Sequence, residues 1–193
     1  KLPEGLKRIE EAAFSDCNKI KSITLNKNLE HLGEYNFTKW TSLKKITVAK
    51  GNKHFIIKKG VLYSKDMKKL YVYPAAMKGK TKFTIPKSVD YVCGYAFSDN
   101  KYLRKVTVKH KVNFGEVSFA NSKSLKKVVF EKPYGYSPEF ENCKKLETVI
   151  LPEGIKGIGS WKFAGCQNIT HINLPTTIKF IGEGAFFNCK NLT

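Results

Sequence analysis

The chain has 193 residues, of which 41% are hydrophobic, and it carries 35 Lys and Arg against 16 Asp and Glu, a formal net charge of +19. The hydrophobic content excludes a disordered polyelectrolyte, and no apolar run approaches the roughly 20 residues that span a bilayer. The charge favours anionic partners, namely an acidic protein surface, an acidic polysaccharide or nucleic acid, but a lysine-rich surface that only keeps the fold soluble has the same composition.

A unit of 21 to 23 residues repeats along the sequence, and its anchor is a phenylalanine. Three residues after it comes a column that accepts Cys, Trp, Asn or Ser, which indicates packing and not catalysis. Three residues further comes an aliphatic column running from Ile20 to Leu192. Both ends of the chain fall inside a unit, so we expect residues 1–193 to be one domain cut from a longer array. The anchors are Phe14, Phe37, Phe97, Phe119, Phe140, Phe163 and Phe186.

Each unit also contains an alternating apolar pair, which predicts a short strand with one buried face. The chain then turns, often at Pro or Gly, and a second short extended piece follows, for example residues 178–181. Residues 184–186 leave room for no more than a helical or 3₁₀ turn. One unit cannot bury its apolar side alone, so the units must stack into a solenoid with a shared core. The pairs, in chain order, are Ile23/Leu25, Ile46/Val48, Phe83/Ile85, Val106/Val108, Val128/Phe130, Val149/Leu151 and Ile172/Leu174.

The spacing is interrupted once, because Phe37 and Phe97 are 60 residues apart. We place an insertion at about residues 51–82. Within it, residues 61–73 alternate on both sides of a polar turn, which predicts a β-hairpin. The rings of Tyr63, Tyr71 and Tyr73 interleave with lysines. They suit contact with a sugar or a peptide, and they also suit packing of the hairpin onto the solenoid.

The motif Leu/Ile-x-x-Ile-x-Leu-Pro-x-x-Ile-x-x-Ile-Gly-x-x-Ala-Phe-x-x-Cys is clearest from Cys143 to Cys189 and returns at residues 2–25. It resembles the BspA-like (Treponema-type) leucine-rich repeat. The insertion also resembles hairpins found in that family, with Met67 in place of the usual turn glycine. The asparagine typical of other leucine-rich repeats survives only at Asn28, and the unit at residues 133–138 is short and irregular, which interrupts the register of any surface crossing it.

The resemblance implies a leucine-rich-repeat solenoid, a right-handed β/α superhelix of short strands and short helical or 3₁₀ turns with a hairpin insertion. It also implies a secreted or cell-surface microbial protein that adheres to a host or microbial surface protein or to a matrix protein.

No constellation for catalysis appears in the sequence. The four histidines lack metal-ligand spacing, and there is no nucleophile elbow, phosphate loop or dinucleotide fingerprint. The two glycines around Glu183 belong to the repeat and indicate a turn. We therefore predict no enzyme activity, no metal and no cofactor. The five cysteines are expected to be free, buried thiols, with Cys93 partly exposed because it stands where the repeat often has glycine.

The outward side chains of the strands define a candidate ligand surface. If Ile23 and Leu25 face the core, Ser22 and Thr24 face outward, and the same alternation in later units builds a basic stripe. Solenoids use such exposed sheets to bind partners. The stripe consists of Lys44, Lys45, Lys82, Arg104, Lys105, Lys109, Lys126 and Lys127.

Three functions remain open. The first is an adhesion or protein-interaction module, expected to be monomeric, whose binding tolerates salt. The second is an electrostatic binder of acidic polysaccharide or another polyanion, whose affinity falls steeply with salt. Nucleic acid is the weaker polyanion, because no recognised nucleic-acid motif appears. The third is a structural spacer without a ligand.

Overall fold

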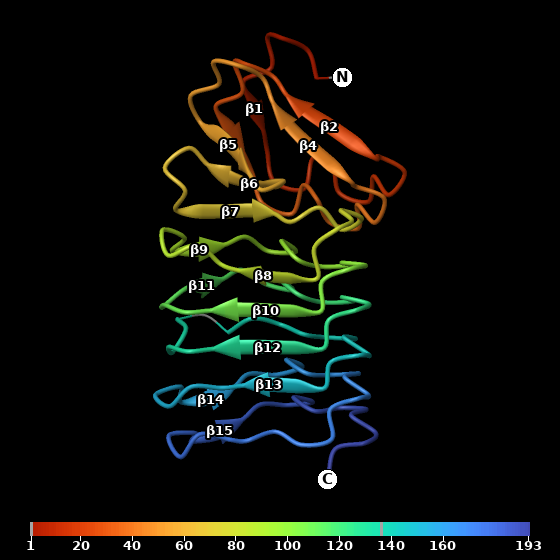
Figure 1. Ribbon diagram of the computed structural model, residues 1–193, viewed down its shortest axis with the longest axis vertical. Helices are drawn as coiled ribbons and strands as arrows, with labels where there is room; N and C mark the ends of the chain where they lie inside the picture. Colours follow the sequence, from red (N-terminus) through yellow and green to blue (C-terminus); the bar gives the residue numbers. More distant parts are fainter. Residues whose placement is uncertain (1, 136) are drawn as a thin grey trace.

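A computed structural model describes residues 2–135 and 137–193 and shows a β-solenoid whose coils stack along one axis, with the two ends of the chain at opposite ends of the stack (Figure 1). The described residues contain fifteen strands of two to four residues each. Because each coil contributes one or two of these strands, the sheets are parallel and run along the stack, apart from the insertion.

The front wall of the solenoid is formed by the strands that the alternating apolar pairs predict. Here β2 (Ser22–Leu25) pairs with β4 (Lys45–Val48), and a separate sheet has the order β13–β12–β10–β8. The prediction is wrong at Ile172/Leu174, where the chain forms no strand because its backbone joins no neighbouring ladder. The second sheet consists of β8 (Lys82–Thr84), β10 (Lys105–Val108), β12 (Lys127–Phe130) and β13 (Thr148–Ile150).

The rear wall is formed by two-residue strands, each from the second extended piece of a coil. β14 and β15 pair in parallel, and residues 180–181 of β15 confirm the extended piece predicted there. The rear strands are β1 (Arg8–Ile9), β3 (His31–Leu32), β9 (Tyr91–Val92), β11 (Asn113–Phe114), β14 (Gly157–Ile158) and β15 (Phe180–Ile181).

The β/α superhelix expected from the sequence is wrong, and so are its helical or 3₁₀ turns around each phenylalanine, since the described residues form non-helical turns there and the solenoid is built of strands. In most coils a residue with positive φ lies two positions before the phenylalanine and another two positions after it, as at Tyr95 (φ 60°) and Asp99 (φ 57°) around Phe97. Left-handed residues break a right-handed helix. The freed N–H groups bond to the next coil instead, Phe97 N to Ser118 O at 2.8 Å, for example.

Inside the solenoid, the five anchor phenylalanines from Phe97 to Phe186 form a continuous stack, whereas Phe14 and Phe37 pack against the separate core of the N-terminal coils. The ring centroids of successive phenylalanines are 4.9 to 5.4 Å apart. The distances are 4.9 Å for Phe97–Phe119, 5.0 Å for Phe119–Phe140, 5.3 Å for Phe140–Phe163 and 5.4 Å for Phe163–Phe186. Such offset pairs stabilise a core beyond the area that they bury. This confirms the phenylalanine column as the spine of the fold.

The column three residues after each phenylalanine packs in the core and also donates hydrogen bonds. The Ser122 hydroxyl donates to the Phe97 carbonyl at 2.7 Å, and the Cys166 thiol donates to the Phe140 carbonyl at 3.1 Å. Trp40 Nε1 donates to the Phe14 carbonyl at 2.6 Å. Each of these three side chains satisfies a carbonyl of the preceding coil, whereas Asn100 in the same column accepts the backbone N–H groups of Tyr102 and Leu103 at its Oδ1.

The insertion is part of the wall and not an appendage. It contains three strands, β5 (Phe55–Lys58), β6 (Val61–Ser64) and β7 (Lys69–Val72), so the hairpin at residues 61–73 is confirmed and a further strand precedes it. A two-residue turn at Lys59 (φ 52°) and Gly60 (φ 85°) joins β5 to β6. β7 pairs in parallel with β9, which places the insertion in the rear sheet β11–β9–β7–β6–β5.

The insertion also separates two hydrophobic cores. Val61 and Tyr63 of β6 pack into the core of the C-terminal coils, whereas Leu62 between them packs into the core of the N-terminal coils. Leu70 and Val72 of β7 are divided in the same way. The hairpin is therefore a wall with a core on each side.

Cys93 is not partly exposed as expected, because 2% of its surface is accessible. The glycines of the same column lie against the backbone of the preceding coil, and a Cβ at Gly182 would lie 2.5 Å from the Ser160 nitrogen. Cys93 opens the first coil after the insertion, where the preceding chain is β7 and not a regular coil. The glycine column therefore has room for the Cys93 side chain at this position, and the insertion covers that side chain.

Candidate binding surface

Three lysines of the predicted stripe lie in register on neighbouring strands of the front sheet. Lys82 of β8 is aligned with Lys105 of β10, and Lys105 is aligned with Lys127 of β12. Neighbouring strands lie about 4.8 Å apart, so the three ammonium groups project from adjacent positions. We call these three residues the lysine ladder. All three side chains reach solvent, and Lys82 is the most exposed.

The next positions along the sheet add further charge beside the ladder. Arg104 and Lys126 are exposed and directly precede Lys105 and Lys127. Lys126 lies 2.6 Å from the Glu147 carboxylate, and Lys109 lies 3.9 Å from Glu131. These two exposed pairs neutralise part of the predicted stripe. In the part of the chain that the structure describes, no carboxylate lies within 4.0 Å of Arg104 or of the ladder amines.

Lys44 and Lys45 do not join this surface. Lys45 belongs to β4, which pairs only with β2, and the insertion separates β4 from β8. The predicted stripe is therefore divided into a patch on β8, β10 and β12 and a second, smaller patch on β4.

The tyrosines of the insertion are mainly core residues. Tyr63 and Tyr73 are each 1% exposed, and Tyr73 contacts the rings of Phe83 and Phe97 at centroid distances of 5.2 and 5.7 Å. Neither tyrosine can present its ring to a ligand, because both rings are buried where the hairpin packs between the two cores. Tyr71 is half-buried, and the Lys69 amine lies 5.3 Å from the centre of its ring.

A polar network at the insertion is not predicted from the sequence. The Glu34 carboxylate accepts hydrogen bonds from Lys69 Nζ at 3.0 Å, from Tyr91 Oη at 3.2 Å and from the Gly94 backbone N–H at 3.2 Å. It thereby connects an N-terminal coil to β7 and to the first coil after the insertion. The only sequence signal is an acid in a lysine-rich region, which does not identify its partners.

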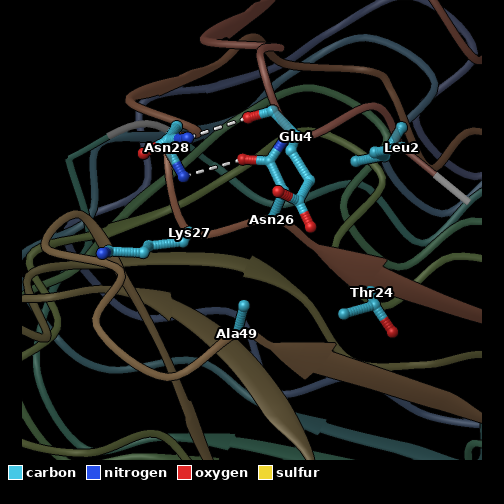
Figure 2. Close-up of a pocket in the computed structure, with 7 residues that line it drawn as sticks. All are labelled: Leu2, Glu4, Thr24, Asn26, Lys27, Asn28 and Ala49. Atoms are coloured by element: carbon cyan, nitrogen blue, oxygen red, sulfur yellow. Dashed lines mark hydrogen bonds between the residues drawn. The ribbon is translucent and has the colours of Figure 1, made fainter.

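A pocket at the N-terminal end of the solenoid is shaped by backbone contacts (Figure 2). Asn28 Nδ2 donates to the Glu4 carbonyl at 2.9 Å, and the Asn28 backbone N–H donates to Asn26 Oδ1 at 2.9 Å. Asn26 and Asn52 also bridge coils: Asn26 Nδ2 donates to the Leu6 carbonyl at 3.0 Å, and Asn52 Nδ2 donates to the carbonyls of Asn26 and Leu29. The amides that shape this pocket hold coils together and bring no nucleophile or base into it.

Among the residues that the structure describes, no group of three or more His, Cys, Asp and Glu is placed to hold a metal ion. The five thiols are free, and burial raises the pKa of Cys143 to about 12 and the pKa of Cys93 further still. Such thiols remain protonated and unreactive. No helix within the described residues could cross a bilayer.

Comparison with known proteins decides the family. The model of the BspA-type leucine-rich-repeat region matches residues 1–78 and 76–193 with six copies. The chain belongs to this family. No curated protein matches it.

Several solved structures of leucine-rich-repeat proteins share the fold of this chain. A leucine-rich cell surface protein from Faecalibacterium prausnitzii A2-165 is 29% identical with a TM-score of 0.90, over 99% of this chain and 51% of that one. A leucine-rich-repeat protein from Eubacterium ventriosum is 25% identical with a TM-score of 0.65, over 97% and 63% of the two chains. The pneumococcal vaccine antigen PcpA is 28% identical with a TM-score of 0.65, over 97% and 41%. The chain thus spans between 41% and 63% of the length of these structures.

Proposed function

We propose that this chain is a non-enzymatic binding module of a secreted or cell-surface protein, and that it adheres to an acidic surface on a partner protein through the front sheet. The observation that carries the proposal is the lysine ladder. Like charges aligned across adjacent strands repel one another and destabilise a free sheet. An anionic partner would remove that repulsion on binding, so the arrangement favours a bound state.

The flatness and position of the ladder favour a protein partner. The patch lies on three strands of one open parallel sheet, a rigid surface of the kind that solenoids use for recognition. Thr84 and Thr107 follow the lysines in the next outward row and offer hydroxyl groups for hydrogen bonding. The similar structure from Faecalibacterium prausnitzii, which is named as a cell surface protein, supports the location.

The test is binding of the purified chain to an array of matrix proteins, acidic glycans and nucleic acids at ~50 mM and ~300 mM salt. The ladder variant replaces Lys82, Lys105 and Lys127 with Gln. The matched control replaces Lys87, Lys111 and Lys156, which are exposed and lie off the ladder, so it loses the same charge.

Binding selective for particular proteins, weaker at ~300 mM than at ~50 mM salt because the lysines pair with acidic groups, is the expected result. The ladder variant should lose this binding and the control should keep it. Binding to many polyanions that disappears at the higher salt, equally in both variants, would replace the proposal with a general polyanion binder. Absence of binding at either salt would leave the spacer function.

A further inference from the structure

A groove opens between β4 and β5, where the front wall meets the insertion. Residues 45–52 line one side of it, residues 55–57 line the other, and Gly60 and Lys65 complete it, with a volume of about 500 Å³. Figure 1 shows both strands near the N-terminal end of the stack, and residues 49–54 connect them. We call it the strand-edge groove.

The β4 side of the groove is a free strand edge. β4 pairs only with β2, and the N–H groups of Lys45 and Ala49 donate to the carbonyls of Lys21 and Leu25. Alternate residues of a parallel strand direct their backbone groups to opposite sides. The N–H and C=O groups of Ile46 and Val48 therefore point away from β2 and toward the groove.

The β5 side is a second free edge. β5 pairs only with β6, and Lys65 N–H donates to the His54 carbonyl at 2.8 Å. The same alternation directs Ile56 and Lys58 toward β6 and leaves the N–H and C=O groups of Ile57 facing away. Asn52 Oδ1 already accepts the Phe55 N–H at 2.9 Å, so Ile57 is the donor open to a ligand on this side.

The side chains around the groove combine an apolar floor with positive charge. Ile56 and Ile57 are half-buried, whereas Lys45, Lys50 and Lys65 are exposed. No carboxylate in the described part of the chain lies within 4.0 Å of these three amines. The groove thus offers backbone hydrogen bonds, apolar contacts and cationic groups to a single extended segment.

We propose that an extended acidic segment of a partner protein docks in the strand-edge groove as an added β-strand on the free edge of β4, with β5 beside it. Strand addition obtains affinity from main-chain hydrogen bonds and specificity from alternate side chains. The lysines select acidic side chains of the segment, and the accessible parts of Ile56 and Ile57, which project from opposite faces of β5, contact its apolar side chains. A second copy of the chain is a poor occupant, because it carries the same net charge of +19 and would place lysine edges together.

The probe is an eight-residue peptide, capped at both ends, in which Glu and Val alternate. Its affinity for the full chain at ~150 mM salt is measured by calorimetry and compared with that of the same peptide N-methylated at alternate residues. N-methylation keeps the charge and removes the donors of one strand edge. Loss of three or four hydrogen bonds predicts that the methylated peptide binds at least about tenfold more weakly. In the same titration, the amide signals of Ile46, Val48 and Ile57 should shift.

Two variants locate the site. Val48→Pro removes an N–H that points into the groove and leaves the bonds of β4 to β2 in place, so it should weaken peptide binding by about two- to tenfold. Lys45→Gln combined with Lys50→Gln should weaken binding about tenfold through lost charge pairing, whereas Lys87→Gln with Lys111→Gln should not. The charge pair keeps the proposal testable if the proline variant does not fold.

Equal binding of the methylated peptide would overturn strand addition and leave electrostatic attraction alone. Amide shifts confined to β8, β10 and β12 would assign the peptide to the lysine ladder instead. Sedimentation as a dimer with the groove amides protected would make a second copy the occupant. This proposal is independent of the ladder, since the ladder variant should bind the peptide normally and the groove variants should keep ladder binding.

Discussion

Gly115→Ala tests whether the glycine column exists because coils approach too closely for a side chain. Gly115 is buried, and its N–H donates to the Val92 carbonyl of the preceding coil at 2.8 Å. An added Cβ would press against the Gly94 nitrogen and lie 2.9 Å from Tyr91 Oη and 3.0 Å from the Cys93 carbonyl carbon. Since the nearest atom belongs to the backbone, neither coil can move aside without disturbing the backbone hydrogen bonds between the two coils.

Two opposing effects set the magnitude. Gly→Ala stabilises a protein by about 0.4–1 kcal/mol through the unfolded chain when the native site accepts the methyl group. Overpacking of a rigid site costs about 1–3 kcal/mol, and a strained inter-coil hydrogen bond costs about 0.5–1.5 kcal/mol more. The steric cost is larger, so we expect Gly115→Ala to lower the free energy of unfolding by about 1–3 kcal/mol.

The assay is urea and thermal unfolding followed by circular dichroism, where each kcal/mol shifts the Tm by about 2–4 °C for a chain of this size. Gly5→Ala is the matched control, because nothing lies within 4 Å of its added Cβ. It should stabilise the chain slightly, by about 0.4–1 kcal/mol. If Gly115→Ala were as stable as the parent chain, the close-approach explanation would be refuted, and with it the account of Cys93.

Four further predictions follow from the core and the junction. Phe119→Ala should cost about 3–5 kcal/mol in urea unfolding, because Phe119 is 0% exposed and stacks on two rings; Phe186→Ala, half-buried with one stacked neighbour, should cost less. Burial raises the pKa of Asp99 above its usual 3.8, so its ionisation opposes folding as the pH rises through the folded pKa. Asp99→Asn should therefore raise the Tm at pH 7, and the gain should disappear at pH 3; a gain that persists at pH 3 would contradict the argument. Thiol labelling of the native chain should modify Cys17 and Cys189 first and leave Cys143 and Cys166 protected until unfolding, since the latter pair is 0% exposed. Glu34→Ala should cost about 1–3 kcal/mol and broaden or split the thermal transition, because its carboxylate joins the coils on both sides of the insertion; a single unchanged transition would refute that role.

Most of the regular solenoid could be predicted from the sequence because stacking repeats the same local environment. The pair Val106/Val108 and its equivalents predict the front strands, and the phenylalanine column predicts the stacked spine. Both depend on a period of about 22 residues and on which side chains face inward, and both properties are written in the sequence.

The turn conformation could not be predicted from segment length alone. Val117 (φ 55°) and Trp161 (φ 61°) adopt left-handed backbone that their side chains do not favour. The bonds to adjacent coils determine it, such as Trp161 N–H to the Glu183 carbonyl at 3.0 Å. These bonds are tertiary contacts, so a prediction based on the local sequence does not include them.

The basic stripe was predicted by assuming that every coil follows the same register. That assumption holds from Lys82 to Lys127, where strands pair directly, and fails at Lys44 and Lys45, where the insertion intervenes. A two-residue turn at Lys59-Gly60 between apolar runs was a usable signal for β5, since such turns favour positive φ.

The insertion interrupts the front wall of the solenoid and leaves the rear wall continuous, and several features follow from this difference. Its last strand, β7, occupies the rear position beside β9, so the rear sheet continues through it, but no strand of the insertion fills the front position between β4 and β8. The front sheet is therefore cut, which divides the lysines into two patches and leaves the β4 edge unpaired. A regular solenoid hides every internal strand edge by stacking. Interrupting one wall and not the other opens an edge without ending the array, because the coils remain joined through β7, β9 and the Glu34 network.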